Sequence, residues 1–177
     1  MNSIIKGCEL NQAVRTKMFG CVSGGKGSMK PEKYQRSKLE LITRHPCPKT
    51  NTRLNRVTRE LVHDCPFPNR LPNGFDISED FDGVQTRYGQ TTYINFKCVV
   101  GRGGSQTRTL REVYLFVETQ LEVSLTLPDT ILFANILDGD EADRVLPKFE
   151  YLLSKDKYSD VRDRVYVGDL RGYLKIY

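Results

Sequence analysis

Alternating apolar and polar positions predict strands in the second half of the chain. Residues 83–88 and 91–100 alternate and are rich in β-branched and aromatic side chains, and the Gly-Gln pair between them favours a hairpin. Residues 131–137 form an uninterrupted apolar run, which is typical of a strand buried on both faces. A shorter apolar segment at 164–170 predicts a last strand.

Apolar side chains at helical spacing predict three helices. Residues 106–123 carry the clearest stripe, and residues 140–155, which include Pro147, predict a further helix after the buried strand. Upstream, residues 52–65 predict a helix as well. The apolar positions of that upstream segment are Leu54, Val57, Leu61 and Val62.

Glycine, proline and small polar residues mark the predicted loops at 19–35, 44–51 and 65–74. The order is then helix, hairpin, helix, strand, helix, strand, which predicts an α/β fold with a central mixed β-sheet flanked by helices. A chain of 177 residues can bury one core. We expect a single domain over 1–177, in which a basic helical and loop part (1–70) precedes the core (75–170).

Charge is unevenly distributed along the chain. Residues 1–70 hold fourteen Lys or Arg and five Asp or Glu, whereas residues 71–177 hold thirteen and seventeen, within a formal net charge of +5. A basic half beside an acidic half suggests a polyanionic partner together with a site that holds cations. A solvated basic surface without a partner would give the same composition.

Composition also bears on the compartment. An apolar run of about 18 residues is lacking, which argues against a membrane span, and the first residues lack the pattern of a signal peptide. Five cysteines, an odd number, argue against a disulfide scaffold and favour a reducing compartment. We therefore expect a cytoplasmic protein, either bacterial or virus-encoded in the host cell.

Two polar residues share one face of the strand predicted over 91–100. Asn95 and Lys97 are two positions apart and therefore point to the same side, and Asp82 stands at the turn that enters the hairpin. A lysine on the buried side of a central strand is costly unless it is paired, and Asp82 is well placed to pair with it. An ordinary structural ion pair would explain the same spacing.

A second carboxylate is available on the next helix. Glu112 lies in the first turns of the helix that should pack back on this strand, so it can overlook the same strand end. Carboxylate oxygens bind Mg²⁺, and a metal together with Lys97 could lower the pKa of water and stabilise a pentavalent phosphate.

Asp82 followed by Asn95-Phe96-Lys97 resembles the PD-(D/E)XK signature of type II restriction endonucleases, and the element order over 75–170 is similar to that superfamily's core. Two positions depart from the motif, because Phe81 replaces its proline and Asn95 its second acid. In one subgroup that acid comes from the next helix, at a spacing close to that of Lys97 and Glu112. The resemblance thus implies four catalytic residues, Asp82, Asn95, Lys97 and Glu112, with all but the lysine near Mg²⁺.

The segment that follows Lys97 is basic and contains no acid before Glu112. Free N–H groups at the start of the helix favour phosphate, and Arg and Gln side chains can read base edges. We expect DNA contacts from Arg102, Gln106, Arg108 and Arg111. Backbone contacts could come from Arg44, Lys49, Arg53 and Arg56. A solvated loop is the alternative interpretation.

Two His-x-Cys-Pro repeats offer a competing metal site. His45, Cys47, His63 and Cys65 could form a tetrahedral Zn²⁺ site, although the spacing inside each pair is shorter than usual. Three further interpretations concern acidic residues. The cluster at 137–143 is typical of a turn and a helix start, although a metal site built from Asp138 and Asp140, at the end of an apolar strand, is the alternative. Glu79 and Asp80 are outer metal ligands or turn residues. Glu60, on the predicted early helix, is an additional candidate carboxylate.

These expectations combine into a Mg²⁺-dependent, sequence-specific endonuclease of double-stranded DNA. As a type II restriction enzyme it would leave a 5′-phosphate and a 3′-hydroxyl, and would act as a homodimer on a palindromic site. Two alternatives stay open. One is a non-catalytic DNA-binding module, with or without structural zinc; the other is a structure-selective repair or recombination nuclease of the same fold.

Overall fold

The computed structural model describes residues 25–64, 71–100 and 103–176. Its helices are α2 (Gly25–Thr43), α3 (Gly104–Ser124), α4 (Asp140–Leu153) and α5 (Leu170–Tyr173). Its strands are β1 (Thr52–Asn55), β2 (Glu60–His63), β3 (Gly83–Arg87), β4 (Gln90–Cys98), β5 (Ile131–Asp138) and β6 (Val165–Gly168). None of the helices in these ranges is long and apolar enough to cross a membrane.

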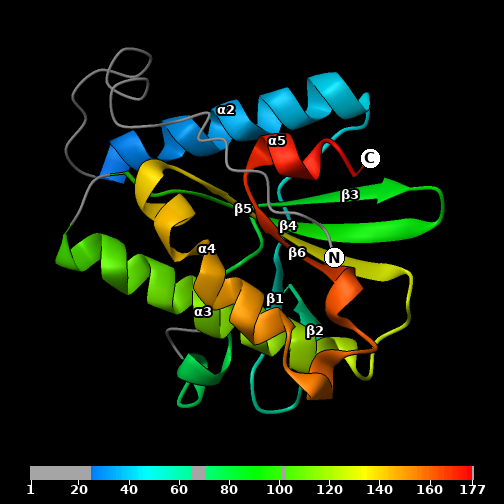
Figure 1. Ribbon diagram of the computed structural model, residues 1–177. Helices are drawn as coiled ribbons and strands as arrows, with labels where there is room; N and C mark the ends of the chain where they lie inside the picture. The colour runs from blue at the N-terminus through cyan, green and yellow to red at the C-terminus, as the bar shows by residue number, and fades with distance from the viewer. Residues whose placement is uncertain (1–24, 65–70, 101–102, 177) are drawn as a thin grey trace.

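A four-stranded mixed sheet, in the order β3-β4-β5-β6, forms the centre of the fold. Helices α2 and α5 cover one face and α3 and α4 the other, while β1 and β2 form a separate antiparallel pair beside α3 (Figure 1). The predicted α/β class, with a central mixed sheet flanked by helices, is therefore confirmed.

The hairpin of β3 and β4 is confirmed, with its turn at Tyr88 and Gly89. Both turn residues have positive φ, 50° and 81°, which matches the twist of a two-residue hairpin. Strand β4 pairs with β3 on one side and runs parallel to β5 on the other. The strand that carries Asn95 and Lys97 is thus internal to the sheet, as predicted.

Strand alternation divides the core between two faces of the sheet. Ile94 and Phe96 pack with Leu39 of α2 and with α5 on one face. Tyr93 packs with α3 and α4 on the other. Because side chains alternate along a strand, Asn95 and Lys97 lie on the α3 face. The predicted helices over 106–123 and 140–155 and the strands over 131–137 and 164–170 are also confirmed.

The helix predicted over 52–65 is wrong, because residues 52–63 form the β1–β2 hairpin. Thr52 and Leu54 are buried while their neighbours are less so, which is the period of a strand. The Asn55 side-chain oxygen accepts hydrogen bonds from the backbone N–H groups of Val57 and Thr58, and Arg59 has a φ of 59°. This local turn breaks the helix that the apolar spacing suggested.

The predicted loop over 19–35 is wrong over its described part, since residues 25–35 belong to α2. The helix includes Pro31, and it is fixed to the sheet by its buried residues Gln35 and Leu39, which lie one turn apart. The loop over 44–51 is confirmed. Of the loop over 65–74, only 71–74 lies within the described residues, where it forms a turn.

Candidate functional site

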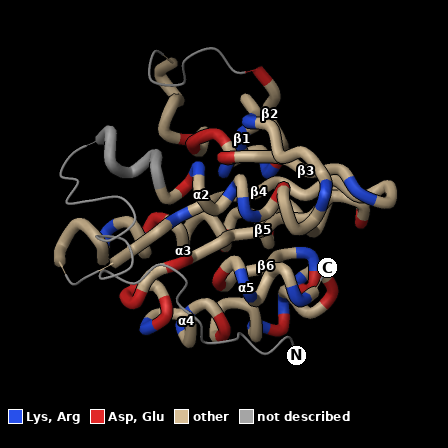
Figure 2. The backbone as a smooth tube through the Cα atoms, turned by 90° about the horizontal axis from the view of Figure 1, so that it is seen from above, with Lys and Arg blue, Asp and Glu red and all other residues tan. Residues whose placement is uncertain are grey.

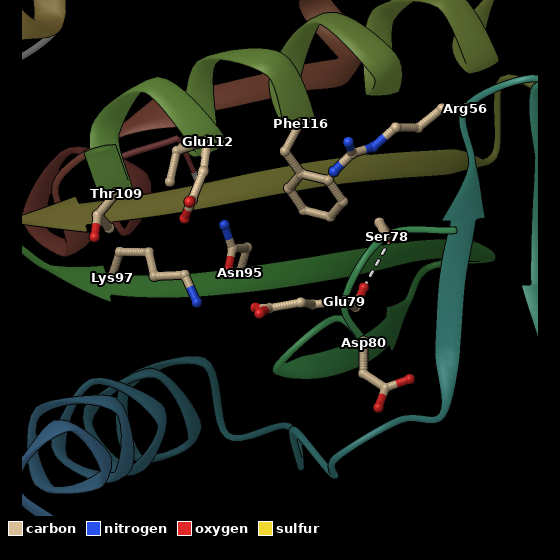
Figure 3. Close-up of a pocket in the computed structure, with 10 residues that line it drawn as sticks. Arg56, Ser78, Glu79, Asp80, Asn95, Lys97, Thr109, Glu112 and Phe116 are labelled. Atoms are coloured by element: carbon tan, nitrogen blue, oxygen red, sulfur yellow. Dashed lines mark hydrogen bonds between the residues drawn. The ribbon is translucent and has the colours of Figure 1, made fainter. Parts of the chain in front are cut away.

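A cavity of about 280 Å³ lies between β4 and α3 and is lined by side chains of both charges. Its polar lining includes Asn95 and Lys97 of β4 and Glu112 of α3 (Figure 3). The segment before β3 adds Glu79 and Asp80. Arg56, from the β1–β2 turn, completes the charged lining. Four separate parts of the chain therefore meet at this site.

The lining from α3 follows from helical geometry. Thr109, Glu112, Val113 and Phe116 recur at spacings of three and four, so they share the face that α3 turns toward β4. In Figure 3 the Glu112 carboxylate points from this face toward Lys97 and Asn95. The prediction that Glu112 overlooks the strand end of Lys97 is confirmed.

The segment before β3 places a further carboxylate at the cavity. Ser78 is fixed by two hydrogen bonds to Leu54 of β1, from its own N–H to the carbonyl and from the Leu54 N–H to its hydroxyl, each 2.8 Å long. The Phe81 N–H also donates to the carbonyl of Thr52, at 3.0 Å. Between these anchors Glu79 points toward Asn95 and Lys97 (Figure 3). Glu79 is the site residue that the sequence pattern left undecided.

Asp82 contacts Lys97 but does not line the cavity. Its Oδ2 atom lies 3.9 Å from the Lys97 Nζ atom and accepts a 2.7 Å hydrogen bond from the Phe96 N–H. The predicted partnership of Asp82 and Lys97 is therefore confirmed. Burial raises the pKa of Asp82, and the Lys97 charge and the Phe96 N–H act in the opposite direction. The Lys97 amine thus connects a largely buried carboxylate to the cavity.

Two of the basic residues expected to contact the DNA backbone, Arg53 and Lys49, form ion pairs. Arg53 forms a 2.8 Å ion pair with Asp80, so the acid of Asp80 is neutralised at the edge of the site. Lys49 lies 3.8 Å from Glu32. Glu60 is an exposed residue of β2 and does not line the cavity, so its expected place on an early helix facing the site is wrong.

The predicted DNA contacts lie around the start of α3, apart from Arg102, which is outside the described residues. Arg108 and Arg111 are exposed, and Gln106 accepts a 2.7 Å hydrogen bond from the Ser105 hydroxyl. Arg44 is also exposed. Basic positions, interspersed with acidic ones, also lie along α2 and beside β1 (Figure 2).

The predicted zinc site falls partly outside the described residues, because Cys65 belongs to the segment 65–70. Cys47 is buried, and burial raises its pKa to about 12, which disfavours the thiolate that zinc requires. The His63 Nδ1 atom lies 3.0 Å from the Thr52 hydroxyl. Among the described residues, no group of three or more His, Cys, Asp or Glu side chains could hold a metal ion.

Comparison with protein-family models, with curated proteins and with solved structures found no match.

Proposed function

We propose that the chain is a Mg²⁺-dependent endonuclease of double-stranded DNA, with the cavity between β4 and α3 as its active centre. One observation carries the proposal. The Lys97 amine, held 3.9 Å from the Asp82 carboxylate, lines a cavity together with Glu79, Glu112 and Asn95. A fixed cation can stabilise the charge that develops on a phosphate, and carboxylates can bind a metal ion that activates water.

The donor atoms at the cavity fit Mg²⁺. The side chains that converge on Lys97 offer carboxylate oxygens from Glu79 and Glu112 and the amide oxygen of Asn95 (Figure 3). Mg²⁺ is bound in proteins through one or two carboxylates, and substrate phosphates and water complete its shell. Glu79 and Glu112, with the third carboxylate of the lining, Asp80, paired to Arg53, therefore match an ion that is shared with a phosphate. A bound Mg²⁺ would supply an activated water and neutralise developing charge.

Lys97 would act on the phosphate and on the attacking water. The Asp82 carboxylate, 3.9 Å from the Lys97 amine, would help to hold this charge in place before the substrate binds. Asp82, which lies outside the lining, would serve to hold Lys97 and would reach the metal only through this contact or through water. Of the three carboxylates in the lining, Glu79 and Glu112 are directed toward Lys97, whereas Asp80 forms an ion pair with Arg53.

The charges around the cavity support a polyanionic substrate. Arg56 lines one end of the cavity, and Arg108 and Arg111 are exposed on α3 within a turn of Glu112. The N–H groups of the first turn of α3 add donors for phosphate. The formal net charge of +5 acts in the same direction. We further propose that the protein is a homodimeric restriction enzyme that leaves a 5′-phosphate and a 3′-hydroxyl.

The test is cleavage of unmethylated, phage-sized duplex DNA in Mg²⁺ and in EDTA by the wild type and two variants. Glu112→Gln removes a proposed metal ligand and should lower the cleavage rate by about a hundredfold or more. Glu150→Gln, an exposed position on α4, is the matched control and should cut at the wild-type rate. Equal rates for both variants would refute the site.

The pattern of products distinguishes the candidates. Discrete bands that depend on Mg²⁺ support a restriction enzyme, and preferential cutting of branched DNA supports a repair or recombination nuclease. The non-catalytic DNA-binding module is favoured by one contact, the hydrogen bond from the Phe96 N–H to Asp82, because it gives that carboxylate a structural role. Salt-sensitive DNA binding without any cutting would support that alternative.

A further inference from the structure

We propose that a chain of buried side-chain amides fixes the orientation of Asn95, so that its oxygen faces the cavity and its nitrogen faces the core. Asn135 of β5 and Gln120 of α3 are the positioning residues of this amide chain. The orientation of the Asn95 amide is argued from hydrogen bonds alone. Only the identification of its ligand as Mg²⁺ rests on the proposed function.

The three amides are neighbours on the α3 face of the sheet. Asn95 and Asn135 are register partners on the parallel strands β4 and β5. Gln120 lies above them on α3, and both Gln120 and Asn135 are fully buried, with Asn95 4% exposed. Buried amides are costly unless their hydrogen bonds are satisfied, so their partners decide their orientation.

The Tyr166 backbone carbonyl determines the orientation of the Asn135 side-chain amide. Since a carbonyl oxygen can only accept, the Asn135 atom facing it must be the nitrogen, which donates at 3.2 Å. The same nitrogen donates to the Gln120 oxygen at 2.7 Å. The Asn135 oxygen therefore faces away from the Tyr166 carbonyl, and it accepts a hydrogen bond from the Gln120 nitrogen at 3.2 Å.

The orientation then passes to Asn95. Its amide nitrogen lies 3.5 Å from the Asn135 oxygen, which already faces it as an acceptor. A flip of Asn95 would bring two oxygens together, and a compensating flip of Asn135 would set its oxygen against the Tyr166 carbonyl. Asn95 therefore presents its oxygen to the cavity that it lines.

An acceptor fixed in this way selects the chemistry of its ligand. The cavity face of Asn95 can take a metal cation or a hydrogen-bond donor, as a carboxylate oxygen would, but it adds no negative charge. Apolar side chains would fill the same core space without needing partners, as Phe133 and Leu137 do on this face of β5. The amide chain is therefore expected to serve the cavity.

The first test uses the unmodified protein in solution. A through-hydrogen-bond NMR coupling between the Asn135 side-chain nitrogen and the Tyr166 carbonyl carbon is expected, together with slow solvent exchange of the Asn135 amide protons. Rapid exchange, with no coupling, would overturn the amide chain, because Asn135 would then be free to flip.

The second test compares two variants in EDTA that add the same charge to the same cavity. Asn95→Asp puts a carboxylate oxygen against the Asn135 oxygen, whereas Thr109→Asp, on the opposite wall, does not meet this amide chain. The unfolding midpoint of Asn95→Asp should lie about 5 °C below that of Thr109→Asp. Equal midpoints would mean that Asn135 reorients, which contradicts the proposal.

Adding Mg²⁺ to the same two variants separates this inference from the proposed function. A midpoint of Asn95→Asp that is low in EDTA and rises in Mg²⁺ more than that of the wild type supports both. If the unfolding midpoint of Asn95→Asp is low in EDTA and unchanged by Mg²⁺, the result supports the amide chain and contradicts the metal-dependent function.

Discussion

Removing the charge of Lys97 should lower the free energy of unfolding, because the largely buried Asp82 carboxylate would lose its ion-pair partner. At a separation of 3.9 Å, two unit charges attract by about 1 kcal/mol in water and by about 4 kcal/mol at an effective dielectric constant of about 20. The Lys97 and Asp82 side chains are 31% and 18% exposed, so the pair is partly solvated. We expect a coupling free energy of about 1–2 kcal/mol, between these limits.

The assay is a double-mutant cycle with Lys97→Met, Asp82→Asn and the double variant, each unfolded by urea at pH 7.5 in EDTA. The amide introduced by Asp82→Asn would keep an oxygen for the Phe96 N–H, so the cycle isolates the charge interaction. Lys155→Met is the matched control, because the Lys155–Glu118 pair has similar exposure and lies outside the cavity. Its expected cost is below about 1 kcal/mol.

The loss of stability caused by Lys97→Met should depend on pH, because it depends on the charge of Asp82. Burial raises the pKa of Asp82 in the folded protein, and removing Lys97 should raise it further. The folded state then binds the proton more tightly, so stability falls as pH rises from the unfolded pKa through the folded one. Lys97→Met should therefore be most destabilising at neutral pH and nearly neutral below about pH 4. A coupling near zero at pH 7.5, or a cost that does not change with pH, would refute the reasoning.

Three further predictions concern the stability of the fold. Asn55→Ala removes the acceptor for two backbone N–H groups in the β1–β2 turn and should cost about 1 kcal/mol in urea unfolding; no loss would contradict the role of that turn. Glu122→Gln should reduce stability at pH 7 but not near pH 3. The Lys157 amine, with the Tyr158 hydroxyl, lowers the pKa of Glu122, so the stability that Glu122 contributes is lost as pH falls through its folded pKa. An equal loss at both pH values would be inconsistent with this linkage. Gly139→Ala should cost about 3 kcal/mol, because φ is 114° and the new Cβ would lie 2.0 Å from the Val99 carbonyl oxygen. Gly89→Ala, with φ of 81° and open space, should cost only about 1 kcal/mol, and a similar loss in both would rule out the steric explanation.

Much of the central sheet could be predicted from the sequence because its pattern is strong. The alternation over β3 and β4 has the period of a strand, the apolar run of β5 has the length of a buried strand, and the α3 stripe is long enough to define a helix. The β1–β2 hairpin could not be predicted from spacing, since Leu54, Leu61 and their apolar neighbours fit either period. A local turn at Asn55 and the packing of Leu54 in the core decided it.

Some contacts of the candidate site could also be predicted from the sequence, and others could not. The pairing of Asp82 with Lys97 follows from strand alternation and the cost of burying a lone charge. The approach of Glu79 could not be foreseen, because it depends on the hydrogen bonds that fix Ser78 and Phe81 to β1. The role of Asn135 depends on strand register, which sequence spacing alone does not define.

The most direct test of the central claim is to add Mn²⁺, a paramagnetic substitute for Mg²⁺, to the isotope-labelled protein and to record which backbone resonances broaden. The account predicts selective broadening at Glu79, Asn95 and Glu112, which is lost in Glu112→Gln and retained in Glu150→Gln. Broadening centred on Asp140 and Glu141 at the start of α4, or none at the cavity with duplex DNA present, would contradict a metal-dependent active centre between β4 and α3.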